Sequence, residues 1–176
     1  MAGNPYWESK EGRQGKETNT VKLTNIEIKN FRGIKHASVF FPQDSRIICL
    51  IGAGDSGKST LLSAIEWALW PSWSLIATDT DFYNSDTTIP IEITVSITEL
   101  PKALMKEDKF GLYLRDFVKV CLGGEDEPTD SGTTILTIQL IIDESLEPKW
   151  NVITSRTEPK PISQKDRRLL SFGQSQ

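Results

Sequence analysis

The stretch CLIGAGDSGKSTLLSAIEWALW, residues 49–70, decides the fold. It opens inside an apolar run at residues 47–51, of the kind found in strands buried on both faces. A glycine-rich turn follows, and after it apolar residues recur three and four positions apart, which is the spacing of one face of a helix. Pro71 prevents this helix from continuing. The sequence therefore predicts a strand, a glycine loop and a helix in direct succession.

The glycine loop fits the phosphate-binding pattern G-x-x-x-x-G-K-[ST], the Walker A P-loop. Glycines let the backbone curl so that successive N–H groups point at a phosphate, and the helix start adds its positive dipole end. Lys58 is then expected to reach the β- and γ-phosphates, and the Ser59 hydroxyl to ligate Mg²⁺. We predict that ATP and Mg²⁺ are bound here. The predicted phosphate-binding residues are Gly52, Ala53, Gly54, Asp55, Ser56, Gly57, Lys58, Ser59 and Thr60.

Alternating apolar and polar residues predict strands on both sides of this unit. They occupy residues 21–31 and 35–42 before it, and residues 89–100 after it, the last as a half-exposed antiparallel strand. Two further segments, separated by ESLEP at 144–148, suggest a hairpin. We expect an α/β fold with a mixed sheet at residues 21–156, a flexible leader at 1–20 and a basic, partly disordered tail at 157–176.

Composition excludes several classes of protein. A net charge of -4 gives no general attraction to nucleic acid, and no apolar run approaches the roughly 20 residues of a membrane span. Residues 1–20 lack the apolar core of a signal peptide, and two cysteines fit a reducing, cytoplasmic location. The single histidine, His36, is expected at the surface and excludes most histidine-based chemistry.

Hydrolysis also needs a carboxylate for Mg²⁺ and one to orient the attacking water. The pair Asp143 and Glu144, which follows an apolar run, is the candidate. Apolar and polar residues alternate along that run, which indicates a strand of a hairpin with one solvent-exposed face. A strand that supplies the Mg²⁺ carboxylate would instead be buried on both faces. The alternatives are a self-sufficient small P-loop NTPase or kinase that uses this pair, and an interaction module that uses the acidic loop or the basic tail.

Residues 23–42, LTNIEIKNFRGIKHASVFFP, followed by the loop stretch, resemble the N-terminal lobe of ABC-type ATPase heads of the RecF/SMC/OLD group. Residues 81–100 are similar to the OLD-like subset, in which an antiparallel β-subdomain follows the P-loop helix. The resemblance implies a P-loop fold that binds ATP and Mg²⁺ and acts on or with DNA, in repair or phage defence. It places Arg32 near the nucleotide or its ribose, and Glu99 where a side chain approaches Mg²⁺.

The resemblance also implies what this stretch lacks. The signature motif, a secure Walker B strand and the switch histidine of these heads lie C-terminal to the residues that match, so hydrolysis is expected to need another lobe. The implied partner is the remaining ATPase lobe or a second copy, with no membrane contact. Family loops usually carry asparagine where this chain has Gly54. We expect ATP binding by this chain with little turnover.

Overall fold

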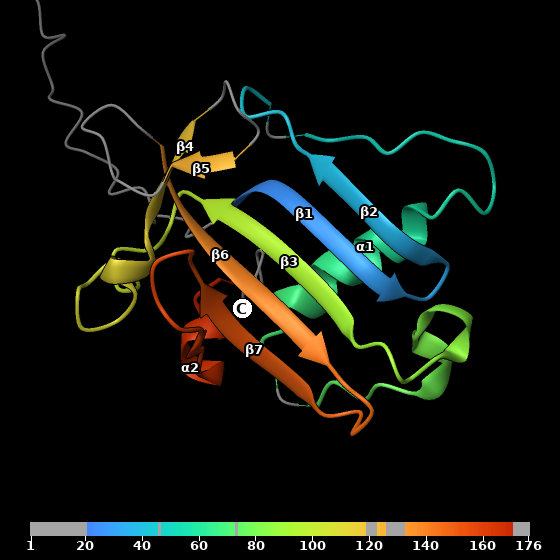
Figure 1. The fold of residues 1–176 in the computed structure, drawn as a ribbon. Helices are drawn as coiled ribbons and strands as arrows, with labels where there is room; N and C mark the ends of the chain where they lie inside the picture. The colour runs from blue at the N-terminus through green and yellow to red at the C-terminus, as the bar shows by residue number, and fades with distance from the viewer. Residues whose placement is uncertain (1–20, 46, 73, 119–122, 126–132, 171–176) are drawn as a thin grey trace, which may run out of the picture.

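The computed structural model describes residues 21–45, 47–72, 74–118, 123–125 and 133–170. An antiparallel sheet with a helix along one face organises them (Figure 1). Its strands follow the order β2-β1-β3-β6-β4-β5, while β7 pairs with β6 and β8 pairs with β7. The strands are β1 (Lys22–Phe31), β2 (Ile34–Phe40), β3 (Ile91–Thr98), β4 (Arg115–Val118), β5 (Gly123–Glu125), β6 (Thr133–Ile142), β7 (Pro148–Ile153) and β8 (Lys160–Pro161).

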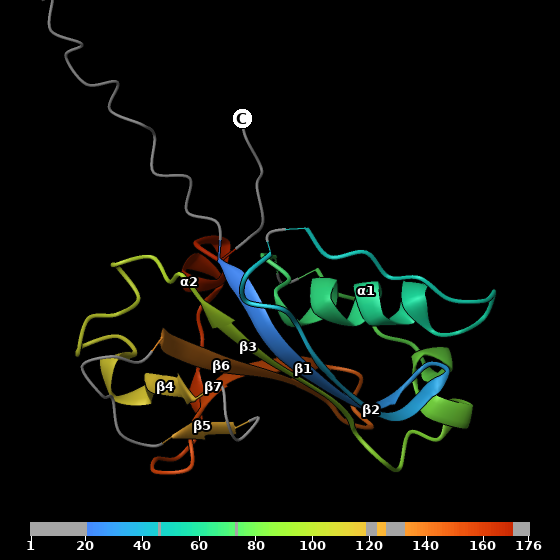
Figure 2. The same cartoon turned by 90° about the horizontal axis from the view of Figure 1, so that it is seen from above.

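The helices lie on one face of this sheet. Seen from above in Figure 2, α1 (Lys58–Ala68) and α2 (Gln164–Arg168) are on one side, and the β4–β5 hairpin is on the other. Three short 3₁₀ turns complete the described elements: η1 (Asp79–Asp81), η2 (Tyr83–Ser85) and η3 (Gly111–Tyr113). The helix predicted directly after the glycine loop is confirmed, and it ends before Pro71.

The core lies between α1 and the central strands. Along β3 every second residue is fully buried, as the alternation at 89–100 predicts. The side of α1 that faces the sheet contributes the buried residues Leu61, Ala64, Trp67 and Ala68. Each large aliphatic side chain that is fully buried stabilises the fold by about 1.5–3 kcal/mol. The sheet contributes Ile26, Ile28, Ile91, Ile93, Val95, Ile97, Leu136, Ile138, Leu140, Ile142 and Val152 to this core.

The opposite face of the sheet is polar at one end and buried at the other. At the polar end, Lys29 Nζ pairs with Glu92 at 3.2 Å, and this hydrogen bond raises the pKa of Lys29. At the other end Ser96 is buried, although its place in the alternation predicts a wet face. Its hydroxyl bonds Thr137 Oγ1 at 2.9 Å, and Arg115 donates to the same oxygen at 2.6 Å. Mutual hydrogen bonding therefore lets these polar groups be buried.

The apolar run at residues 47–51 does not join the sheet, so the prediction of a strand buried on both faces is wrong. Ile47 and Ile51 are 80% and 94% exposed. No strand pairing among the described residues includes this run, and the described pairings are antiparallel rather than mixed. A doubly buried strand needs neighbours along its edges and cover on its faces. Among the described residues the run has no such neighbour: the edge strand β2 pairs only with β1.

Residues 160–170, expected as part of a basic tail, instead pack against the sheet and α1. Leu170 is fully buried, and Arg167 is only 4% exposed. The Arg167 guanidinium lies 3.7 Å from the centre of the Trp150 ring, and Nη1 donates to the Trp70 carbonyl at 3.0 Å. Burial lowers the pKa of Arg167 to about 10, so this side chain stays charged at neutral pH. The face of the Trp150 ring and the carbonyl of Trp70, which follows the end of α1, stabilise this cation.

The Arg167 contacts predict the effect of removing them. Arg167→Ala should lower the free energy of unfolding by about 1–3 kcal/mol, because the carbonyl and the ring lose their partner. Lys165→Ala, at an exposed position on the same short helix, should change it by less than about 0.5 kcal/mol. Urea unfolding followed by tryptophan fluorescence measures both. Equal effects of the two substitutions would mean that residues 160–170 do not pack as described.

Candidate functional site

The glycine loop joins the exposed run at 47–51 to the N-terminus of α1. Gly57, the residue before the helix, has φ 82°, and Asp55 has φ 56°, so both lie in the left-handed region. Gly57 takes this conformation without steric cost because it has no Cβ. The first helical hydrogen bond, from Leu61 N to Gly57 O, is 2.8 Å long. The loop therefore turns sharply and aims the helix start at the space beside it.

That space is a polar hollow of about 450 Å³, within the range of roughly 300–1,000 Å³ typical of small-ligand sites. Six consecutive loop and helix residues line one side, and the β1–β2 turn lines the other. The hollow is therefore formed where the start of α1 meets the first hairpin of the sheet. Its lining residues are Gly33, Ile34, Asp55, Ser56, Gly57, Lys58, Ser59 and Thr60.

The electrostatics of the hollow favour an anion. The first turn of α1 contains no acidic residue, and no side chain caps its N–H groups. The helix start therefore presents N–H donors and the positive end of its dipole. Lys58 Nζ adds a charge and donates to the carbonyls of Gly52 and Ala53 at 3.0 and 2.5 Å, and to Ser56 Oγ at 3.0 Å. A phosphate could replace these neutral acceptors with stronger, charge-assisted bonds.

Two glycines of the loop differ in the room around them. A Cβ added at Gly52 would lie 2.9 Å from Ser56 Oγ and 3.9 Å from Lys58 Nζ, whereas a Cβ at Gly54 would meet nothing within 4 Å. A side chain at position 52 would therefore require Ser56 Oγ to move. A Cβ at the Gly54 position, by contrast, meets no steric obstacle.

Arg32 lies at the turn between β1 and β2, next to the hollow but directed away from its lining. Its Nε forms an ion pair with Asp81 Oδ1 at 2.9 Å, and its backbone N–H donates to the Asp81 carbonyl at 2.7 Å. The guanidinium also lies 4.9 Å from the centre of the Phe31 ring and 5.2 Å from that of Trp67. Its neighbours Gly33 and Ile34 line the hollow instead.

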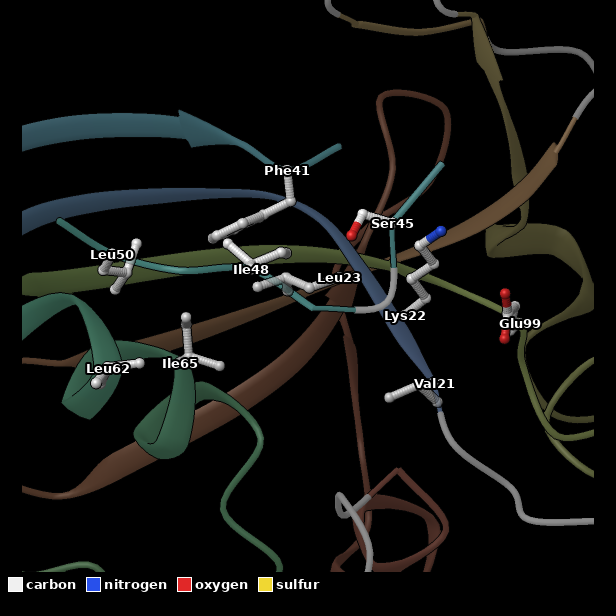
Figure 3. Close-up of a pocket in the computed structure, with 10 residues that line it drawn as sticks. All are labelled: Val21, Lys22, Leu23, Phe41, Ser45, Ile48, Leu50, Leu62, Ile65 and Glu99. Atoms are coloured by element: carbon white, nitrogen blue, oxygen red, sulfur yellow. The ribbon is translucent and has the colours of Figure 1, made fainter. Parts of the chain in front are cut away.

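Glu99 stands apart from the loop. It follows β3 with φ 55° and lines a different, apolar groove, together with Val21 and Lys22 (Figure 3). Ser59 lines the loop hollow, so the structure does not bring the two predicted magnesium ligands together. Within the described part of the chain, no group of three or more His, Cys, Asp or Glu is placed to hold a metal ion.

Asp143 and Glu144 lie in the turn of the β6–β7 hairpin, as the alternation predicts. They line a third hollow that shares no residue with the loop hollow. Lys149 Nζ donates to Asp143 Oδ2 at 2.6 Å, and Ser145 Oγ donates to Oδ1 at 2.5 Å. These bonds hold the pKa of Asp143 well below its usual range, and the hydrogen bond from Lys149 makes the largest contribution. A carboxylate that resists protonation in this way is a poor general base.

Sequence reasoning did not identify Ile34 as part of the loop hollow, or Asp81 as the partner of Arg32. The Ile34 side chain lies 3.8 Å from the position that a Cβ on Gly57 would take. The sequence signal that could have identified Ile34 is its position directly after the Phe-Arg-Gly turn, where the first predicted strand ends. Nothing local marks Asp81, because its contact with Arg32 spans 49 residues of sequence.

No helix among the described residues has the length and apolarity to cross a membrane.

Comparison with protein families gives a match to the AAA ATPase domain over residues 22–164. The chain belongs to this family of ATPase domains. The match includes the glycine loop, α1 and the strands of the core. It therefore connects the loop hollow with a family named for ATP hydrolysis.

Curated relatives match this AAA ATPase domain over shorter stretches. An OLD nuclease of Thermus scotoductus is 36% identical over 76 residues, 42% of this chain and 14% of the nuclease. An uncharacterised protein of Methanocaldococcus jannaschii is 44% identical over 50 residues, 28% of this chain and 14% of that protein. The matched stretches thus span about one seventh of these relatives' length.

A solved structure shares the fold. It comes from work on the ATP-driven dimerization and DNA-stimulated activation of SMC ATPases. The superposition has a TM-score of 0.50 at 13% sequence identity and covers 85% of this chain and 81% of the other. The α/β fold of this AAA ATPase domain is thus that of the SMC-like ATPases, as the sequence resemblance to the RecF/SMC/OLD group implies.

The two loop glycines give a test of the hollow. Gly52→Ala should force Ser56 to rotate away from Lys58, at a cost of about 0.5–1.5 kcal/mol. It should thereby weaken Mg-ATP binding by up to roughly tenfold. Gly54→Ala meets open space and should leave the affinity within about twofold. Isothermal titration calorimetry measures the Mg-ATP affinity of both variants. Weaker binding by Gly54→Ala than by Gly52→Ala would contradict the described loop.

Proposed function

We propose that this chain is the ATP- and Mg²⁺-binding lobe of an OLD/RecF/SMC-like ATPase head that acts on or with DNA, in repair or phage defence. The observation that carries the proposal is the loop hollow. There Lys58, a helix start with no acidic residue in its first turn, and the curled glycine backbone face one polar space. These are the parts that bind the phosphates of a nucleotide. Membership of the AAA ATPase domain family supports ATP as the ligand.

Ser59 is our candidate for the magnesium ligand. Its hydroxyl belongs to the first turn of α1 and lines the hollow next to Lys58. Bound phosphates would supply further oxygen ligands, because Mg²⁺ is usually held by one or two protein groups and substrate phosphates. Arg32 and Glu99 are weaker candidates for the nucleotide site, since Arg32 pairs with Asp81 and Glu99 lines another groove.

Hydrolysis by this proposal needs a second lobe. Among the described residues that line the hollow, Asp55 is the only carboxylate, and it lies on the loop itself. A water-activating carboxylate and groups that stabilise the transition state must then come from outside these residues. We propose that they come from the remaining ATPase lobe or from a second copy, in the cytoplasm. The ATP-driven dimerization and DNA-stimulated activation described for the SMC ATPases of the matching structure support this assembly and the DNA contact.

The first test concerns ATP binding. Lys58→Ala should weaken Mg-ATP binding by about 10- to 100-fold, because a hydrogen bond to a charged group contributes roughly 1.5–3 kcal/mol. Lys102→Ala removes an exposed lysine that does not line the hollow, and it should bind like the unaltered chain. Isothermal titration calorimetry measures both affinities. Unchanged affinity in Lys58→Ala would refute the proposed site.

The second test separates the proposed lobe from a self-sufficient NTPase. The chain alone should bind Mg-ATP with little or no phosphate release, and Asp143→Asn should leave both properties unchanged. Phosphate release is followed by a coupled colorimetric assay with the Lys58→Ala variant as background. Robust turnover that Asp143→Asn abolishes would establish the self-sufficient enzyme instead.

A further inference from the structure

One residue of the loop hollow opposes the binding of an anion. Asp55 is the only carboxylate among the described residues that line the hollow, and it is exposed. Within the described part of the chain, its side chain forms no hydrogen bond or ion pair. Lys58 bonds instead to two carbonyls of the loop and to the Ser56 hydroxyl. The Asp55 carboxylate therefore has no direct partner at the place where phosphates are proposed to bind.

The backbone of the loop does not account for this carboxylate. Asp55 has φ 56°, which lies in the left-handed region. Glycine takes this conformation without steric cost, and asparagine is favoured there as aspartate is. Two uncharged residues would thus allow the same turn, so the turn requires no negative charge at this position. What the charge changes is the ligand that the hollow accepts.

The charges of the hollow nearly cancel. Lys58 supplies a full positive charge, and the start of α1 is equivalent to about half of one. Asp55 cancels the charge of Lys58, so only about half a unit remains. The N–H donors of the helix start and of the curled loop still point at the space. The hollow therefore holds a phosphate chain by directed hydrogen bonds while it offers little net charge.

The Asp55 charge acts on a ligand throughout this space. A hollow of about 450 Å³ is roughly 10 Å across, which is close to the Debye length of about 8–10 Å at ordinary salt. Salt therefore screens the charge only in part. The Coulomb energy is proportional to the charge of the ligand, and Mg²⁺ cancels about half of the negative charge on ATP. In free energy, Asp55 thus disfavours metal-free ATP about twice as strongly as Mg-ATP.

We infer that Asp55 is a selectivity residue of the nucleotide site: it admits the magnesium complex of ATP and disfavours metal-free ATP and other bare polyphosphates. The inference rests on the proposed function, because it concerns the same hollow. A role for Asp55 as a metal ligand makes the opposite prediction, that loss of the carboxylate weakens Mg-ATP binding. No group of three or more metal-binding side chains among the described residues supports that role.

Calorimetric titrations of the full chain with Mg-ATP, and with ATP in excess EDTA, test the inference. Low ionic strength is used because it screens charges least. Asp55→Asn keeps the size of the side chain and suits the same backbone conformation, so it removes only the charge. It should tighten the binding of Mg-ATP about threefold and of metal-free ATP about tenfold, because the change in free energy doubles with the ligand charge. The preference for Mg-ATP should therefore fall about threefold.

Further variants and a salt series identify charge as the cause. Asp55→Gly, which also suits φ 56°, should behave as Asp55→Asn does. Asp108→Asn removes an exposed carboxylate outside the hollow and should leave both affinities within about twofold. At about 1 M salt the Debye length is about 3 Å, and the effect of Asp55→Asn should disappear. Tripolyphosphate, which lacks the nucleoside, should depend on Mg²⁺ and on Asp55 as ATP does.

The possible results distinguish this inference from the proposed function. No binding of either ligand by the unaltered chain would overturn both. Binding of Mg-ATP by the unaltered chain, with the same two affinities in Asp55→Asn, would overturn the inference alone. So would an equal gain for both ligands that persists at high salt, which would assign the effect to the shape of the loop. Weaker Mg-ATP binding in Asp55→Asn would make Asp55 a metal ligand and would also overturn it.

Discussion

The packing of α1 on the central strands is the constraint on which the rest of the structure depends. Ala64 and Ala68 are fully buried, and their small side chains let the helix approach the sheet closely. Trp67 then contacts Phe31, with 5.0 Å between the ring centres. Because the helix is rigid, this contact also sets where its first residue lies. The loop hollow forms at that point, where the helix start faces Ile34 and the β1–β2 turn.

The far end of the helix is held by two donors from distant sequence. Trp150 Nε1 donates to the Trp67 carbonyl at 3.1 Å, and Arg167 Nη1 donates to that of Trp70. Carbonyls at a helix C-terminus have no partner within the helix, and they favour positive charge. Trp150 of β7 and Arg167 of α2 thus hold the end of the helix that positions the loop.

Lys58, which lines the hollow, and Arg32, at the adjacent turn, are held very differently. Lys58 is bonded to neutral carbonyls and a hydroxyl of its own loop, partners that a phosphate can replace at a gain. Arg32 is held by a carboxylate and two aromatic rings, which a nucleotide would have to outcompete. This difference supports a phosphate-binding role for Lys58. It makes Arg32 a residue that fastens the β1–β2 turn to the segment containing Asp81.

Local pattern was enough to predict the glycine loop, α1 and the strands whose alternation is regular, because each depends on residues close in sequence. It also indicated that Asp143 lies in a hairpin and not beside the loop. Residues 47–51 were mispredicted, and the burial of Arg167 was not foreseen, for a common reason. A strand needs a neighbour, and a buried cation needs a partner, and in both cases the deciding group lies far away in the sequence.

The sequence by itself determined two features: a curled, glycine-rich loop, and directly after it a helix with one apolar face. The spacing and the types of the residues are sufficient to specify each of them. Only the tertiary structure decided what surrounds that loop. It placed Ile34 across the hollow, paired Arg32 with Asp81 and placed Glu99 in another groove. It also left residues 47–51 outside every strand pairing of the described residues. The physical reason is that hydrogen bonds and burial depend on which distant segments meet, and local periodicity does not specify those meetings.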